Sequence, residues 1–209
     1  LHGNDESEDQ KHEVRDHRKV YGKASRMVLS SDMRAFDIAQ EPGTIRQQYG
    51  TSAFASGCLM ARRLIEAGVT FVEVAAGNWD THQDNFDRTS SLCEQIDKPY
   101  AFLLEDLKQR GLLEQTLVVW MGEFGRTPRV NNNAGRDHWG SVMSVMMAGG
   151  GLQPGIIGSS NSKGEVPADK PYRPEHVLAM AYRHLGIDPS LTFPDHSGRP
   201  RYLLEGRQV

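Results

Sequence analysis

Two apolar stretches, VTFVEVA at residues 69–75 and TLVVWM at residues 116–121, decide the predicted fold of this chain. Both are rich in β-branched and aliphatic residues, which is typical of strands buried on both faces of a sheet. A third stretch, SVMSVMMA at residues 141–148, has the same character. We therefore predict three neighbouring strands in one sheet. The first two are expected to be parallel, because a helical segment lies between them and supplies the crossover.

Helical patterns alternate with these strands. Residues 52–67 are predicted to form a helix, because apolar residues recur every three to four positions and Gly68 follows as a stop signal. A second helix is predicted over residues 90–109, with a kink or restart at Pro99, and a third over residues 174–185. The expected fold class is therefore α/β, with a largely parallel sheet flanked by helices.

The first 48 residues are predicted to form a separate region. Residues 1–10 are acidic and polar, and residues 11–38 have the pattern of one or two amphipathic helices. A cluster of capping residues at 30–32 predicts a break between those helices. We assign residues 1–48 to a polar tail with a helical segment, and residues 49–209 to the α/β domain.

Composition and charge exclude several classes of function. The 209 residues include 24 Lys+Arg and 27 Asp+Glu, a net charge of -3, which is not the basic balance typical of nucleic-acid-binding proteins. No stretch approaches the roughly 18 consecutive apolar residues of a membrane-spanning helix. The two cysteines, Cys58 and Cys93, match no zinc or redox spacing. We interpret both as small buried hydrophobic residues, with a single disulfide left open.

Polar loops follow the first two predicted strands, at the sheet edge where α/β proteins bind ligands. The first loop carries Asp80 and His82, and the second carries Glu123 and the adjacent pair Asp137 and His138. Carboxylate oxygen and imidazole nitrogen together suit a divalent metal, here expected to be Zn, Mn or Ca. In an extended loop Asp80 and His82 face the same way, so both can face one ion. Of Asp137 and His138, one is expected to bind the metal while the other orients a neighbour.

The second loop also carries residues suited to an anionic ligand. Arg126 and Arg136 can bind an oxyanion such as phosphate, sulfate or carboxylate. Any one loop residue also has a structural explanation, because Asp and His are common in turns and caps. Trp79 and Trp139 are interpreted as covering the sheet edge, with a pocket-lining role left open. His196 is interpreted as a turn residue, with a ligand role left open.

Several motifs resemble the family called domain of unknown function 1501. These are WDTH at residues 79–82, GEFGRTP at 122–128, GRDHW at 135–139 and MAGGG at 147–151. The resemblance runs in order from about Tyr49 to the end of the chain. It implies a relation to alkaline-phosphatase-like and sulfatase-like proteins, and therefore an alkaline-phosphatase-like sheet.

The resemblance also implies a metal site. Members of that superfamily bind two divalent metals beside a Ser or Thr nucleophile. By position, Asp80 and His82 match the first metal-binding loop of the superfamily. Glu123 occupies the position of the Asp that follows a later strand, and His138 matches a histidine ligand that comes later in the chain. Phe124 stands where the superfamily has a metal-binding histidine. One of the two metal sites is therefore expected to be weakened or lost.

The superfamily's nucleophile follows a first strand near the N-terminus, and no such pattern occurs in residues 1–50. The resemblance therefore implies that this chain is the C-terminal half of a longer domain. We expect its sheet to be completed on the N-terminal side by the missing half or by another chain. An exported or periplasmic location is also implied, because many members carry an export leader, although none is visible here.

Two hypotheses of function follow. The first is a metal-dependent hydrolase of phosphate or sulfate esters, in which a metal polarises the ester oxygen and an arginine holds the anionic group. Its nucleophile is not assigned in this chain. The alternative is a non-catalytic exported or surface-assembly protein that keeps the fold with one metal or none. The clustered acidic and histidine residues favour the first hypothesis, and Phe124 favours the second.

Overall fold

The computed structural model describes the backbone of residues 5–204 and the side chains of residues 15–26 and 28–204. The helices are α1 (Asp5–Leu29), α2 (Gly43–Tyr49), α3 (Ala53–Glu66), α4 (Asn85–Gln109) and α5 (Pro174–His184). The strands are β1 (Leu117–Trp120), β2 (Gly125–Arg126), β3 (His138–Trp139), β4 (Met146–Gly149), β5 (Ser159–Ser160), β6 (Pro167–Asp169), β7 (Thr192–Pro194) and β8 (Pro200–Tyr202). Short 3-10 turns lie at Ser31–Phe36, Ile38–Gln40 and Leu113–Gln115.

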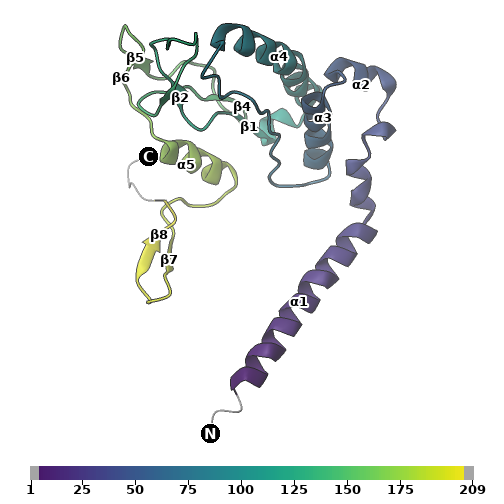
Figure 1. Ribbon diagram of the computed structural model, residues 1–209. Coiled ribbons are helices and arrows are strands. Elements are labelled where there is room, and N and C mark those ends of the chain that lie inside the picture. Colours follow the sequence, from purple (N-terminus) through teal and green to yellow (C-terminus); the bar gives the residue numbers. More distant parts are fainter. Residues whose placement is uncertain (1–4, 205–209) are drawn as a thin grey trace.

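The expected α/β fold with a largely parallel sheet is wrong. The described strands form only two-stranded antiparallel sheets, which pair β1 with β4, β2 with β3, β5 with β6 and β7 with β8 (Figure 1). In the β1–β4 pair, Val118 lies opposite Ala148. The stretch at residues 69–75 joins no ladder within the described chain, so the predicted parallel pair and the alkaline-phosphatase-like sheet are both absent.

The exposure pattern at residues 71–76 explains that error. Exposed and partly buried residues alternate along this segment, which is the two-residue period of a strand. Val72 and Val74 are partly buried, and Val74 packs against the core beside Gly57 of α3, whereas Phe71 is 74% exposed. The apolar pattern therefore identified a segment that covers α3 with one face. The apolar pattern does not show whether another strand forms hydrogen bonds with this segment.

The predicted helices are confirmed by the structure. α3 begins after Ser52, whose side chain accepts a hydrogen bond from the Ala55 backbone N–H and so caps the helix. Gly68, just past its end, has a φ of 88°, a left-handed conformation that favours glycine. α4 begins at Asn85, earlier than predicted, and continues through Pro99 as one helix, so the predicted possibility of a restart there is wrong. α5 begins at Pro174 as predicted.

The break predicted in the N-terminal helical segment is also present. α1 ends at Leu29, and the Ser30 side chain accepts a hydrogen bond from the Asp32 backbone N–H at the start of the following 3-10 turn. α1 extends away from the rest of the chain (Figure 1). Its apolar Val20 and Val28 side chains are exposed. Within the described part of the chain, no helix combines the length and the apolar character that crossing a membrane requires.

The core lies where α2, α3 and α4 meet. Its buried members are Tyr49, Ala55, Cys58, Leu59, Leu103 and Leu107. Burial raises the pKa of the Cys58 thiol to about 12, so this cysteine is a packed hydrophobic residue as predicted. Cys93 is exposed on α4, so the prediction of burial for that residue is wrong.

A buried arginine forms ion pairs between these helices and the segment before them. Arg62 on α3 is 1% exposed, and its guanidinium lies 2.8 Å from a Glu41 carboxylate oxygen and 2.9 Å from an Asp106 oxygen. The Tyr49 hydroxyl donates to the same Asp106 carboxylate at 2.8 Å. The hydrogen bond from Arg62 keeps the pKa of Glu41 below its usual value despite burial. The buried charges thus compensate one another.

We predict that Arg62→Met lowers the free energy of unfolding by about 3–5 kcal/mol, because it leaves Glu41 and Asp106 buried without their central cation. Urea denaturation measures this change. The control is Lys19→Met, which removes an exposed ion pair to Asp16 on α1 and should cost no more than about 1 kcal/mol. Equal, small effects of the two changes would contradict a structural role for the Arg62 network.

Candidate metal centre

Backbone hydrogen bonds hold the loop before α4 against the loop that follows β2. The Arg136 N–H donates to the Thr81 carbonyl at 3.0 Å, and the Asn85 N–H donates to the Ala134 carbonyl at 2.9 Å. These bonds join residues that are about fifty positions apart in sequence. They bring together the two polar loops from which the sequence predicted a site.

The contact between the loops is closest at Gly135. A Cβ atom added at this position would lie 1.9 Å from both the carbonyl carbon and the oxygen of His82. No side chain fits in that space, so glycine is required for the two backbones to approach each other. This approach sets the position of His82 relative to His138, which lies three residues after Gly135.

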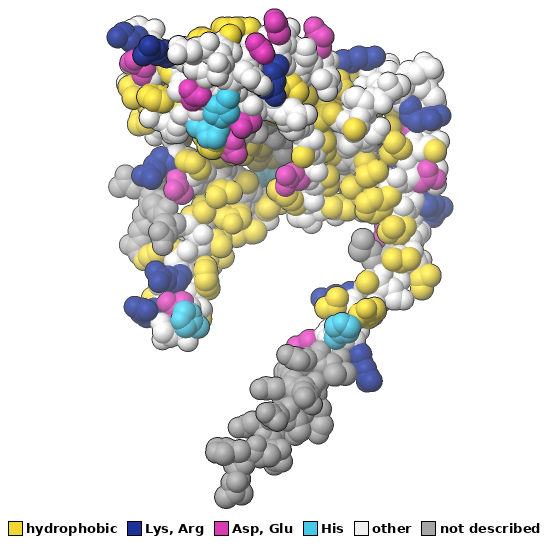
Figure 2. Space-filling model, in the orientation of Figure 1, with side chains coloured by type: hydrophobic (Ala, Val, Ile, Leu, Met, Phe, Trp, Pro, Cys, Tyr) yellow, Lys and Arg dark blue, Asp and Glu magenta, His cyan; other side chains and the backbone are white. Residues whose placement is uncertain are grey.

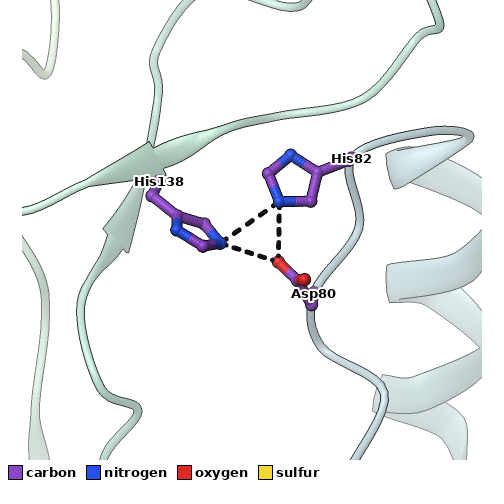
Figure 3. Close-up of side chains that lie close together, drawn as sticks. All are labelled: Asp80, His82 and His138. Atoms are coloured by element: carbon purple, nitrogen blue, oxygen red, sulfur yellow. Dashed lines mark hydrogen bonds and ion pairs between the residues drawn. The ribbon is translucent and has the colours of Figure 1, made fainter.

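Three side chains from these loops converge (Figure 3). His82 Nε2 lies 3.0 Å from Asp80 Oδ1 and 3.2 Å from His138 Nε2, and His138 Nε2 lies 3.0 Å from the same Asp80 oxygen. Asp80 and His82 come from the loop before α4, and His138 comes from β3 (Figure 3). Asp80 and His138 are exposed and His82 is half-buried, so the cluster is open to solvent. We call it the Asp80–His82–His138 triad.

The spacing of the triad fits one small cation. Ligand atoms that share an ion at about 2.1 Å lie about 3.0 Å apart in octahedral geometry and about 3.4 Å apart in tetrahedral geometry. The three separations of 3.0, 3.0 and 3.2 Å fall within this range. Three protein ligands on one side of a solvent-open position are typical of catalytic rather than structural metal sites.

Asp137 lies behind the triad. Its Oδ1 is 2.7 Å from His82 Nδ1, the ring nitrogen that points away from Asp80. This contact keeps the pKa of Asp137 below its usual value, so the carboxylate is ionised and can only accept. The proton of His82 therefore belongs on Nδ1, which leaves the Nε2 lone pair directed at Asp80 and His138. A carboxylate that orients a histidine ligand in this way is typical of metal centres.

The sequence analysis did not identify Asn131, whose side chain holds His82, Asp137 and Gly135 together by hydrogen bonds. Its Nδ2 donates to Asp137 Oδ1 at 3.1 Å and to the His82 carbonyl at 3.0 Å. Its Oδ1 accepts from the Gly135 N–H at 2.9 Å. The available signal was its place in the Asn-rich stretch at residues 131–133, since asparagine commonly organises turns through its own side chain.

The surroundings of Asp80 favour its ionised form. A hydrogen bond from His138 and a second one from Arg126 lower the pKa of Asp80 to about 2. Arg126 Nη1 lies 2.6 Å from the same Oδ1 atom that faces both histidines. At neutral pH the triad therefore presents a carboxylate anion, which is the form that binds cations.

The remaining predicted site residues lie around the triad. Glu123 is exposed, 3.8 Å from Arg126, and is not part of the triad. The Phe124 ring packs 4.4 Å from the His138 ring, between centroids. Arg136 Nη1 donates to two backbone carbonyls of the turn at residues 127–128, at 2.6 and 2.7 Å. The structure thus brings together three of the predicted metal ligands and places Arg136 in the loop scaffold.

The two tryptophans and His196 lie outside this cluster. Trp139 is half-buried and its indole N–H donates to the Glu165 carbonyl at 2.7 Å, so it holds a neighbouring loop. Trp79 is partly buried beside Asp80. His196 is exposed in the turn between β7 and β8.

The fold and the triad define a mixed α/β protein with a solvent-open candidate metal centre. The chain belongs to the family described as "Protein of unknown function (DUF1501)", which it matches over residues 2–209. The family resemblance seen in the sequence is therefore confirmed. None of the curated proteins and none of the solved structures compared with the chain matches it. The comparisons provide no link to alkaline-phosphatase-like or sulfatase-like proteins.

We predict that Gly135→Ala destabilises the protein by about 1–3 kcal/mol, because the new methyl group forces the His82 backbone away. Thermal unfolding measures the loss, and the imidazole NMR signals of His82 and His138 should shift. Gly140→Ala is the matched control, since nothing lies within 4 Å of a Cβ at that position. If both variants behaved alike, the loop contact would not be the constraint that we describe.

Proposed function

We propose that the Asp80–His82–His138 triad binds one divalent metal ion and that the protein is a metal-dependent hydrolase of phosphate or sulfate esters. The observation that carries the proposal is the convergence of three ligand atoms within 3.0–3.2 Å of one another. Two imidazole nitrogens and one carboxylate oxygen are a donor set that binds divalent transition metals in proteins.

The donor set favours Zn or Mn over Ca. Calcium prefers six to eight oxygen ligands, whereas imidazole nitrogen suits zinc and other transition metals. Asp137 supports this choice, because its bond to His82 Nδ1 leaves the opposite nitrogen free to bind a metal.

Each residue has a distinct task in the proposed chemistry. The bound ion supplies Lewis-acid polarisation of an ester oxygen. Asp80, His82 and His138 hold the ion on one side and leave its other side open to substrate, and Asp137 keeps His82 in the required tautomer. Arg126, next to Asp80, is the nearest cationic group for the anionic part of the substrate. No described residue is assigned as nucleophile.

We predict that the protein binds one Zn²⁺ per chain in calorimetric titrations. Alanine at Asp80, His82 or His138 should weaken binding by at least about 100-fold, and Asp137→Asn by about 10–100-fold, because it removes only the orienting contact. The matched control is His196→Ala, which removes an exposed histidine from a distant turn. Equal affinity of the wild type and all triad variants would refute the metal centre.

We predict hydrolysis of an aryl phosphate or an aryl sulfate by the zinc- or manganese-loaded protein, with activity lost on chelation. Asp80→Ala should abolish turnover, whereas His196→Ala should leave it unchanged. A protein that binds metal stoichiometrically but hydrolyses neither ester would contradict the enzymatic proposal. That result would favour the alternative of a non-catalytic member that keeps one metal.

A specific observation favours that alternative, a role in an exported or surface assembly. The strand-like segment at residues 71–76 has no hydrogen-bonded neighbour in the described chain, and Phe71 on it is 74% exposed. Ile156 and Ile157 are 99% and 69% exposed, and apolar side chains gather along the side of the molecule between α1 and the β7–β8 hairpin (Figure 2). Exposed apolar areas of this kind mark interaction surfaces.

For this second candidate, we propose that an extended polypeptide segment pairs along residues 71–76 and completes a sheet there. The 209-residue chain alone should then bind a hydrophobic dye strongly and self-associate, and Phe71→Ser should reduce both effects. Leu29→Ser, an exposed apolar residue on α1, is the control. A monodisperse monomer that unfolds cooperatively and binds little dye would contradict a need for another chain.

A further inference from the structure

Arg126 and Asp80 form a pair that a bound cation would have to disturb. Resting on the metal centre proposed above, we infer that Arg126 is an oxyanion-binding residue whose availability is coupled to cation binding. In the metal-free protein Arg126 is neutralised by Asp80. When a divalent cation takes up the charge of Asp80, Arg126 exchanges that carboxylate for a tetrahedral oxyanion beside the ion.

The crowding at one oxygen atom supports this exchange. Asp80 Oδ1 faces Arg126 Nη1 at 2.6 Å and both histidine Nε2 atoms at 3.0 Å. A cation held by the triad shares this oxygen, so it competes directly with the guanidinium for the same negative charge. Two cationic groups on one oxygen repel each other, and an anion placed between them relieves that repulsion.

The local charge balance points to the same coupling. The two loops that form the triad carry three carboxylates, Asp80, Glu123 and Asp137, and two guanidiniums, Arg126 and Arg136. With neutral histidines this set carries a net charge of about -1, which disfavours anions. A divalent cation changes the net charge to about +1, so the same surface then attracts an oxyanion.

Arg126 is the arginine that fits this role, because Arg136 is engaged elsewhere. Arg136 donates to two backbone carbonyls and its guanidinium lies 5.7 Å from the centre of the Phe86 ring, so it stabilises the loop. Arg126 donates to Asp80, with the more distant Glu123 as its other carboxylate neighbour at 3.8 Å. Release from Asp80 therefore frees the Arg126 fork for bidentate binding of an oxyanion.

Phe124 keeps Arg126 beside the triad during such an exchange. The Arg126 guanidinium carbon lies 5.5 Å from the centre of the Phe124 ring, and that ring also packs against His138. A cation–π contact does not depend on Asp80, so it holds the guanidinium near the ion after the ion pair has been released. Phe124, which cannot bind a metal, thus acts as a positioning residue for the anion site.

The test uses inorganic sulfate as the probe, titrated calorimetrically into the full chain with and without one equivalent of zinc chloride. Zinc should increase the sulfate affinity at least about fivefold, and sulfate should increase the zinc affinity by the same factor, because coupling between two sites is reciprocal. Arg126→Ala should bind zinc more tightly than the wild type in the absence of sulfate and should lose the coupling.

Arg129→Ala is the control, because it removes an exposed arginine of the same loop. It should keep both the zinc affinity and the coupling to sulfate. If zinc binds but sulfate affinity does not change, or if Arg126→Ala keeps the full coupling, this inference is overturned while the metal centre stands. If the wild type binds no zinc, the metal centre and this inference fail together.

Discussion

The close approach of Gly135 to His82 is the constraint on which the site depends. The loop before α4 and the loop that follows β2 touch backbone to backbone at this point, and any Cβ at residue 135 would collide with the His82 carbonyl. Asn131 reinforces the contact by bonding both of these residues through its side chain. The triad and its orienting carboxylate join residues of the two loops that meet at this point. The buried Arg62 network stabilises the helices on which the first loop rests.

In the candidate site, one carboxylate oxygen interacts with several neighbouring groups at once. A single oxygen of Asp80 serves two histidines and Arg126, so a change at any one of them affects the other two. This arrangement is suited to cooperative binding of a cation and an anion, since each ligand removes a repulsion that the other would meet. In the proposed metal centre, the aromatic residue at position 124 would act without binding the metal. Phe124 contacts the His138 ring and Arg126 instead.

Local signals in the sequence predicted the local structure well. Capping and stop residues located α3, α5 and the break after α1, and the apolar run at β1 marked a real strand. The sheet could not be predicted in the same way, because apolar content indicates burial and does not identify a hydrogen-bonded neighbour. The segment at residues 71–76 shows the difference, with strand-like exposure and no described ladder. Among the site residues, Asp80, His82 and His138 were grouped from residue type, whereas the scaffold contacts of Arg136 and the bracing by Asn131 depend on the folded loops.

The central claim is that two histidines and one carboxylate hold a single metal ion. X-ray absorption at the zinc edge, on the full chain loaded with one equivalent of Zn²⁺, tests it most directly. We predict a first shell of nitrogen and oxygen at about 2.0–2.1 Å, with outer-shell scattering from two imidazoles that falls to one in His138→Ala. A shell without imidazole, or one containing sulfur at about 2.3 Å, would contradict the account.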